Sequence, residues 1–451
     1  MDTDHRTPFF RHKKLERKCV WCFNQFSREG ALILPKSLEE TIDIQRERGL
    51  DKQYRDQNYS YFPTDEGWNS FLNFIDYLHC SEPFRSRTTN NELFSEVNKA
   101  FARILSSGML PESIYELLGE LDDSFVEDLF NRKERIVSKL HGISTETDYI
   151  IRIGNCWIGR FEQLSINNKP GKGAEILEEA LSETFPSPTT VIVGEIQSGT
   201  EEFAKEASAH SVDLSLALLQ VLVNFSHERS FQSLKKIVKV ERPEQGISKH
   251  LDLILYGNTN SLTEISWSTR FLSSPFKIDQ KILDLWNNDL GLSALNYVVS
   301  QPQDTDLYKR FENSLLFFRQ ATLQTSSELQ LAVLWISVES FFTATSETVT
   351  KANVEALATL TSRTIRKEYW PSGAKSDLEL RSVLTKHYAN RSRIAHHGRR
   401  GLVTQTEVQQ LSTLVCNLII TVAWALYRGA GTHEELQSSA AFLGPSHGRP
   451  Y

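Results

Sequence analysis

Residues 377–401 read DLELRSVLTKHYANRSRIAHHGRRG, and this stretch decides the fold of the last third of the chain. Its apolar residues recur at intervals of three and four, which is the spacing of one buried face of a helix. Gly398 supplies a left-handed cap, so we expect a helix that starts near Asp377 and finishes around Ile394. A helix with a single apolar face is stable only when other elements cover that face.

Helical patterns continue on both sides of this stretch, from Lys277 almost to the end of the chain. Short polar links separate them, which is typical of a helical bundle. The longest apolar run, from Leu414 to Leu426, is interrupted by Asn417 and is shorter than the ~20 residues needed to cross a bilayer. We therefore expect it to be a buried or dimer-facing helix. The helical patterns are KIDQKILDLWNN, LYKRFENSLLFFRQATL, SELQLAVLWISVESFF, NVEALATLTSRTIRKEYW and TEVQQLSTLVCNLIITVAWALYRG.

The sequence before the bundle is mixed in character. Residues 66–141 carry helical patterns, whereas 148–270 combine β-branched strand patterns such as TTVIVGEI with one helical pattern, SVDLSLALLQVLVNF. We therefore predict an α+β, mostly helical protein, in which a mixed N-terminal and middle region precedes an all-α helical bundle. The expected parts are a basic, irregular lead-in at 1–65, an α+β sensing or regulatory region at 66–275, the bundle at 276–431 and a flexible tail at 432–451.

The composition indicates a globular protein of two or three domains, because 451 residues exceed the size of a single core. Apolar residues make up 40% of the chain, which is ample material to bury. The net charge of −7 argues against a global electrostatic grip on nucleic acid, so any such contact must be local. Five scattered cysteines and the polar start MDTDHRTPFF predict a reducing, cytoplasmic location away from membranes.

The densest chemistry lies in HYANRSRIAHHGRRG, residues 387–401, where four arginines and three histidines crowd an otherwise acidic chain. Arginine presents a fork of donors that matches phosphate oxygens, and histidine exchanges a proton near neutral pH. Together they can run phosphodiester chemistry without a metal. On an unbroken helix Arg391 and His396 would point to rather different sides. We therefore expect the helix to end between them, so that His396 lies on the following turn and both side chains converge.

This local pattern resembles the signature of HEPN ribonucleases, in which a histidine follows an arginine and a polar residue at a distance of four to six positions. The stretch from Tyr388 to His396 is similar to the form carried by the Apea-like HEPN branch. A second similarity is Glu339, which interrupts the apolar stripe of LQLAVLWISVESFF much as family members carry an acidic residue in an early bundle helix. The resemblance covers roughly the last 130 residues.

The resemblance implies a homodimer with a composite cleft for single-stranded RNA, and no metal or other cofactor. His396 would be the general base on the ribose 2′-hydroxyl, and Arg391 would hold the scissile phosphate. Cleavage would leave a 2′,3′-cyclic phosphate and a 5′-hydroxyl. Glu339 could fix Arg391 by a bidentate pair inside the bundle. The remaining candidates are His397, Asn390 and Ser392 for catalytic support, His397 being an alternative to His396 as the base, and Arg393, Arg399 and Arg400 for RNA phosphate binding.

Several other interpretations stay open. The Arg/His cluster could be a solvated helix end whose cations complement the helix dipole, and Glu339 could be a buried acid paired for structure alone. The bundle could be a non-catalytic RNA- or nucleotide-binding and dimerisation module. It could equally be a toxin held silent by a regulatory or antitoxin partner, and kinship favours a role in anti-phage defence. Cys19 and Cys22 form a CxxC pair, for which no second pair stands at zinc-site spacing.

Overall fold

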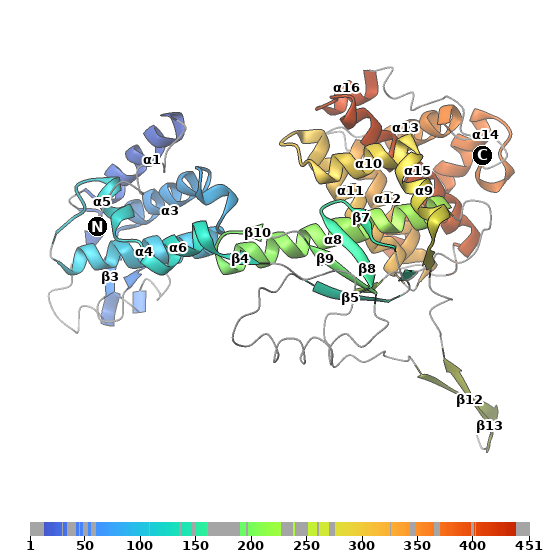
Figure 1. Ribbon diagram of the computed structural model, residues 1–451, viewed down its shortest axis with the longest axis horizontal. Coiled ribbons are helices and arrows are strands. Elements are labelled where there is room, and N and C mark those ends of the chain that lie inside the picture. Colours follow the sequence, from blue (N-terminus) through green and yellow to red (C-terminus); the bar gives the residue numbers. More distant parts are fainter. Residues whose placement is uncertain are drawn as a thin grey trace. The chain divides into compact units, whose positions relative to one another are not determined.

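The structure of the chain, a computed structural model, comprises two compact units (Figure 1). The N-terminal unit comprises Met1–Arg135 and Ile196–Ala209, and the C-terminal unit comprises Ile136–Glu195 and His210–Tyr451. The structure describes residues 13–28, 30–33, 42–44, 46–47, 53–55, 60–107, 109–134, 137–141, 143–145, 149–160, 190–194, 197–226, 238–239, 251–258, 261–269, 276–324, 326–342, 349–364, 370–397, 401 and 403–438.

Aromatic side chains form the core of the N-terminal unit. Phe26 of helix α1 contacts the rings of Phe71, Phe74 and Phe101, with centroids 4.8–5.4 Å apart. Helix α1 packs along α3, so this core is built between the first two long helices and α4. The elements are α1 (Lys13–Phe26), β1 (Leu32–Ile33), β2 (Tyr54–Arg55), β3 (Ser60–Pro63), α3 (Asp65–His79), η2 (Phe84–Ser86), α4 (Asn90–Ser106), α5 (Ile114–Gly119), α6 (Asp123–Asn131), β4 (Lys133–Glu134) and β10 (Gln197–Ser198).

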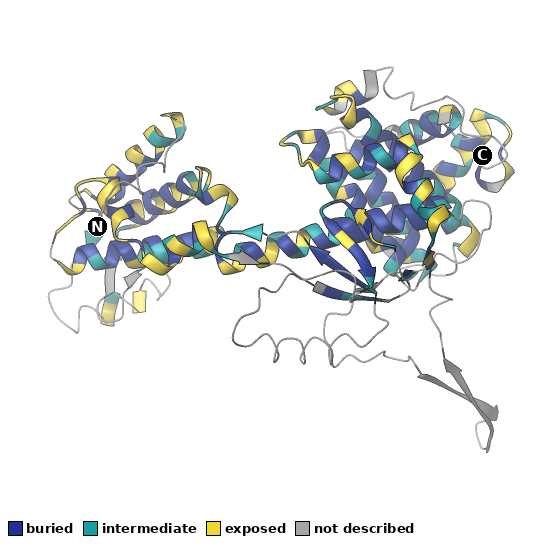
Figure 2. Ribbon diagram, viewed as in Figure 1, coloured by how far each residue is buried: buried dark blue, intermediate teal, exposed yellow. Residues whose placement is uncertain are grey.

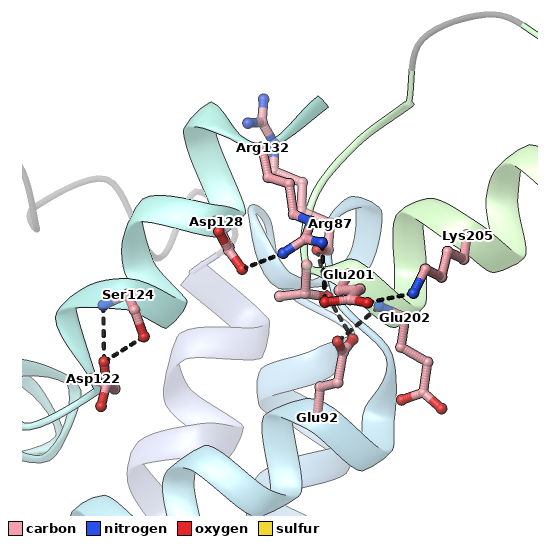
Figure 3. A network of polar contacts seen from close by, with 10 residues as sticks. Arg87, Glu92, Asp122, Ser124, Asp128, Arg132, Glu201, Glu202 and Lys205 are labelled. Atoms are coloured by element: carbon pink, nitrogen blue, oxygen red, sulfur yellow. Dashed lines mark hydrogen bonds and ion pairs between the residues drawn. The ribbon is translucent and has the colours of Figure 1, made fainter. Parts of the chain in front are cut away.

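The start of helix α8 (Glu201–Ser226) is fastened inside the N-terminal unit by Glu92 of α4 (Figure 3). The Glu92 carboxylate accepts hydrogen bonds from the Thr200 hydroxyl and from the backbone N–H of Glu202, the latter at 3.0 Å. The backbone N–H of Glu202 is one of the first donors of the helix, which have no partner within the helix itself. Just before the helix, the backbone at Gly199 lies against the backbone of Arg87. Only glycine fits there, since a Cβ at this position would lie 2.5 Å from the carbonyl oxygen of Arg87. Helix α8 continues from this unit into the C-terminal one.

A five-stranded sheet of order β11-β5-β9-β8-β7 forms one layer of the C-terminal unit, and its described neighbours are antiparallel. Its inward residues, such as Ile151, Ile158 and Ile192, share a core with Val212–Phe225 of α8. A separate short pair joins β14 to β6 in parallel, and β12 and β13 form a hairpin. The strands are β5 (Val137–His141), β6 (Ile143–Thr145), β7 (Ile151–Ile153), β8 (Cys156–Arg160), β9 (Thr190–Gly194), β11 (Val238–Lys239), β12 (Leu251–Asn258), β13 (Ser261–Thr269) and β14 (Phe276–Ile278).

Helices complete the C-terminal unit and pack around the apolar helix α15, most of whose residues are buried (Figure 2). Helix α15 packs against α10, α11, α12 and α13, and α14 packs against α12 and α13. The elements are α9 (Gln280–Asn288), α10 (Leu290–Ser300), α11 (Asp306–Leu323), α12 (Ser327–Phe342), α13 (Val349–Thr364), η4 (Pro371–Gly373), α14 (Asp377–His397), α15 (Gln405–Tyr427) and α16 (His433–Ser438).

Two of the described helices, α8 and α15, are long and apolar enough to cross a membrane by length and composition alone. However, 72% of the apolar window of α8 and 78% of that of α15 lie buried inside the protein. Burial in a core therefore accounts for their apolar character, as expected for Leu414–Leu426.

The prediction of an α+β, mostly helical protein is confirmed, but three local expectations differ from the structure. Residues 13–26, expected to be irregular, form helix α1. This helix is stabilised by burial of Cys19, Cys22, Phe23 and Phe26. The helical region predicted up to residue 141 ends at Asn131 and gives way to strands β4 and β5. The boundaries between the compact units fall after Arg135, after Glu195 and within α8 rather than near residue 275. The second part of α8 belongs to the same core as the five-stranded sheet and the helical bundle.

Candidate functional site

Helix α14 carries the Arg/His cluster as far as His397 and packs against α12 and α13. Its start is capped by Ser376, whose hydroxyl accepts a hydrogen bond from the backbone N–H of Glu379. Leu380, Leu384 and Tyr388 are buried at intervals of four, so they define the face that meets the bundle. Arg391 lies one turn further along this same face and is directed at the bundle.

Arg391 is bound to Glu339 of α12, the contact expected from the sequence. Nη2 of Arg391 donates to Oε2 of Glu339 at 2.8 Å, and the two side chains are only 21% and 16% exposed. The pair is not bidentate as expected. The other carboxylate oxygen, Oε1, accepts a hydrogen bond from the Tyr388 hydroxyl at 2.7 Å. Glu339 therefore links two α14 residues that lie three positions apart.

Tyr388 is confined by aromatic and polar neighbours. The Trp335 ring meets it edge-on with centroids 5.0 Å apart, and the Arg391 guanidinium carbon lies 5.8 Å from its centroid. Burial and the adjacent Glu339 carboxylate raise the pKa of the Tyr388 hydroxyl, so this group is a hydrogen-bond donor at neutral pH. Asn353 of α13 is fully buried beside it and lowers that pKa slightly, although its amide atoms do not reach hydrogen-bond geometry with any described residue.

His396 does not lie where the sequence interpretation placed it. Helix α14 remains helical through His397, so the expected end around Ile394 is wrong. The reason is local: the residues between Arg391 and His396 are all compatible with a helix, and the first residue that breaks helices is Gly398. Five helical steps separate the two side chains by roughly 140°, so Arg391 faces the bundle while His396 is exposed on another side. Within one chain they do not converge.

The remaining candidates differ in accessibility. Asn390 is buried, Ser392 is half-buried, and Arg393 is exposed near His396 along the helix. The buried Asn390 side chain is thus poorly placed to touch a bound polymer. The side chain of His397, and Arg399 and Arg400 as whole residues, lie outside the part of the chain that the structure describes.

His387 is a buried member of the cluster that the sequence interpretation did not use. It is 1% exposed, and its Nδ1 has no hydrogen-bond partner among the described residues. Its Nε2 lies 3.8 Å from Oε1 of Glu407, but burial lowers the pKa of His387, so at neutral pH the contact joins a neutral ring to a carboxylate. Burial of His387 could have been predicted from its spacing, because it lies four residues before Arg391 on the same face of the helix.

The two cysteines of the CxxC pair are buried core residues of α1. Burial raises the pKa of Cys19 to about 12, so its thiol is protonated and unreactive at neutral pH. Among the described residues, no group of three or more histidine, cysteine, aspartate or glutamate side chains is arranged to hold a metal ion.

Comparisons of the chain with protein-family models, with curated proteins and with solved structures find no match. The residues around Arg391 are therefore the basis for a functional proposal.

Proposed function

We propose that this protein is an endoribonuclease of the HEPN type that cleaves single-stranded RNA without a metal ion. The observation that carries the proposal is the Arg391–Glu339 pair at 2.8 Å, in which the arginine of the motif is anchored by an acid from another bundle helix. An arginine held in this way is preorganised to meet a phosphate, because less side-chain entropy is lost on binding.

The proposed reaction is an internal transesterification of RNA. His396 accepts the proton of a ribose 2′-hydroxyl, and the resulting oxygen attacks the adjacent phosphorus. Arg391 stabilises the charge that develops on the non-bridging phosphate oxygens. The bond to the 5′-oxygen breaks, that oxygen takes a proton, and the products are a 2′,3′-cyclic phosphate and a 5′-hydroxyl.

The reaction requires two copies of the chain. Because Arg391 and His396 of one α14 are separated by roughly 140°, a single chain does not direct both at one phosphate. In a two-fold symmetric homodimer, the exposed His396 of one copy can complete the site around Arg391 of the other. Arg393, and Arg399 and Arg400 beyond it, would add local positive charge for the RNA backbone.

The separation of Arg391 and His396 around α14 also favours a second candidate function. A helix that presents Arg391 and His396 on different sides also suits a non-catalytic RNA- or nucleotide-binding and dimerisation module. Retained RNA binding without cleavage by the wild-type protein would favour this alternative.

The biological setting follows from kinship rather than from chemistry. Ribonucleases of this type serve in anti-phage defence or as toxins, in a cytoplasmic location, and an unrestrained one would harm its own cell. The N-terminal unit, or a regulatory or antitoxin partner protein, would keep the composite site misaligned until a trigger arrives.

The test is cleavage of a labelled single-stranded RNA in excess EDTA by the wild type and by Arg391→Ala, His396→Ala and His397→Ala variants, with the product ends mapped. The proposal predicts cyclic phosphate ends, insensitivity to the chelator, and loss of cleavage with Arg391 and with one of the two histidines. Equal cleavage by all variants, or 3′-hydroxyl ends, would rule it out.

A further inference from the structure

Helix α1 has an outer face that is basic and carries an exposed tryptophan. Its inner face is buried in the aromatic core of the N-terminal unit. On the opposite side, Lys14, Arg17 and Trp21 follow one another at intervals of three and four, so they form one strip along the helix. Both cations are exposed, and Trp21 is 61% exposed. These three residues, with the exposed Lys13 beside them, are the outer strip of α1.

The cations of the outer strip are not neutralised by neighbouring acids. Among the residues that the structure describes, Lys13, Lys14 and Arg17 take part in no ion pair. The acid between them in the sequence, Glu16, accepts a hydrogen bond from the Tyr115 hydroxyl of α5 at 3.3 Å. It therefore faces α5 on a different side of α1. The strip is a local concentration of positive charge on a chain whose net charge is −7.

Helix stability does not explain these residues. The N-terminal end of a helix carries partial positive charge, so cations are unfavourable in the first turn and favourable in the last one. Lys13 and Lys14 occupy the first turn of α1, whereas its last turn contains no basic residue. Trp21 leaves most of its surface in water, so it adds little to the core. Residues that oppose the local rules of stability are expected where a surface meets a partner.

The chemistry of the outer strip fits a single strand of nucleic acid. Lysine and arginine bind phosphates, and a tryptophan ring stacks on an unpaired base of any sequence. From Lys14 to Trp21 the strip extends over about 10 Å of helix, the length of about three stacked nucleotides. A membrane fits less well, because a helix that lies on a membrane presents its apolar face to the lipid. The apolar face of α1 is buried in the core.

We propose that the outer strip of α1 binds a single strand of nucleic acid, with Lys14 and Arg17 on its phosphates and Trp21 stacked on a base. The site belongs to the N-terminal unit and uses neither Arg391 nor His396, so it goes beyond the proposed function. Its contacts are to phosphates and to the face of a base. Little sequence preference is therefore expected.

The test measures binding of the full-length protein to a fluorescent RNA strand of about fifteen nucleotides by anisotropy. The strand carries 2′-O-methyl riboses, so it keeps its bases and phosphates but has no 2′-hydroxyl that could attack a phosphate. Trp21→Ala is expected to weaken binding roughly five- to hundredfold, and Trp21→Phe, which keeps an aromatic ring, to weaken it less. Lys14→Ala combined with Arg17→Ala is expected to lower the slope of log K against log salt concentration by about 1.4, because each phosphate contact of a single strand contributes about 0.7.

The matched controls remove the same groups elsewhere. Lys99 pairs with Glu96 and Lys205 pairs with Glu201, and all four residues belong to the N-terminal unit. Lys99→Ala combined with Lys205→Ala removes the same charge as the strip variant and is expected to leave the salt slope unchanged. Trp157→Ala removes a tryptophan of β8 that is 40% exposed and is expected to leave the affinity unchanged.

Photocrosslinking places the strand on the protein. A strand with 4-thiouridine is expected to crosslink to peptides of α1 in the wild type and to lose that crosslink in Trp21→Ala. Crosslinks confined to residues 387–401, strip variants that bind like the wild type, or equal salt slopes for the two lysine and arginine double variants would each overturn the proposal. Binding of vesicles of phosphatidylserine through Trp21, without binding of the strand, would overturn it in favour of a membrane. A wild type that binds the strand but cleaves no RNA would reject the proposed function alone.

Discussion

Replacing Glu339 with alanine removes the acceptor shared by two donors on α14. The Tyr388 hydroxyl and Nη2 of Arg391 would both lose their partner, at 2.7 and 2.8 Å in the native protein. A buried donor left unpaired costs about 1–3 kcal/mol, and a charged one costs more. Arg391 is 21% exposed, so water can meet part of its need. We therefore expect the free energy of unfolding of the C-terminal unit to fall by about 2–4 kcal/mol.

The control for this prediction is Glu355→Ala. Glu355 of α13 pairs with Nε of Arg381 on α14 at the same separation, 2.8 Å, but these side chains are 43% and 40% exposed. The Arg381 Nε–H also does not meet hydrogen-bond geometry. An exposed ion pair contributes about 0–1 kcal/mol, so we expect Glu355→Ala to lower the free energy of unfolding only slightly.

The assay is urea unfolding of both variants, monitored with a probe in the helical bundle because the two units need not unfold together. The free energy of unfolding should fall strongly in Glu339→Ala and slightly in Glu355→Ala, and its dependence on urea concentration should be unchanged in both. Equal losses for the two variants would refute the reasoning, since it depends on burial rather than on distance.

Two further predictions concern other buried polar groups. Glu92→Ala removes the cap of α8, so amide exchange at Glu202 should accelerate while exchange at residues 212–225 stays slow; uniform acceleration along α8 would contradict a local role for Glu92. Burial lowers the pKa of His387 below its ordinary 6.5, so the unfolded chain takes up a proton that the folded chain resists, and stability falls as the pH drops below about 6.5, by at most ~1.4 kcal/mol per pH unit. His387→Gln should flatten that dependence in urea unfolding at pH 5–8, and an unchanged slope would show that His387 is not its source.

The helices of the C-terminal unit were predictable because each carries an apolar face of its own. The patterns beginning at Ser327, Asp377 and Thr406 correspond closely to α12, α14 and α15. Helix α1 was missed because its first turns, KKLERK, are charged and conceal the buried Cys22, Phe23 and Phe26 that follow. The pairing of β5 with β9, more than fifty residues apart in the chain, depends on tertiary packing that no local pattern contains.

Prediction of the candidate site anticipated one contact between helices and failed for a helix end. The Glu339–Arg391 contact was expected from the family resemblance; it is present, but as a single hydrogen bond rather than a bidentate pair. The hydrogen bond from the Tyr388 hydroxyl to Glu339 could not be predicted, because the sequence does not tell which donor lies against which carboxylate oxygen. The end of α14 was not predictable from Gly398 alone, because the residues before it are all compatible with a helix and continue α14 to His397.

The most direct test of the central claim asks whether Arg391 of one copy works with His396 of another. Dimers assembled from equal amounts of Arg391→Ala and His396→Ala chains contain one intact composite site in each mixed dimer. Although each variant alone is inert, the mixture is expected to recover roughly a quarter of the wild-type rate of RNA cleavage in EDTA. A mixture as inert as its parents, beside a wild type that cleaves, would contradict the composite site.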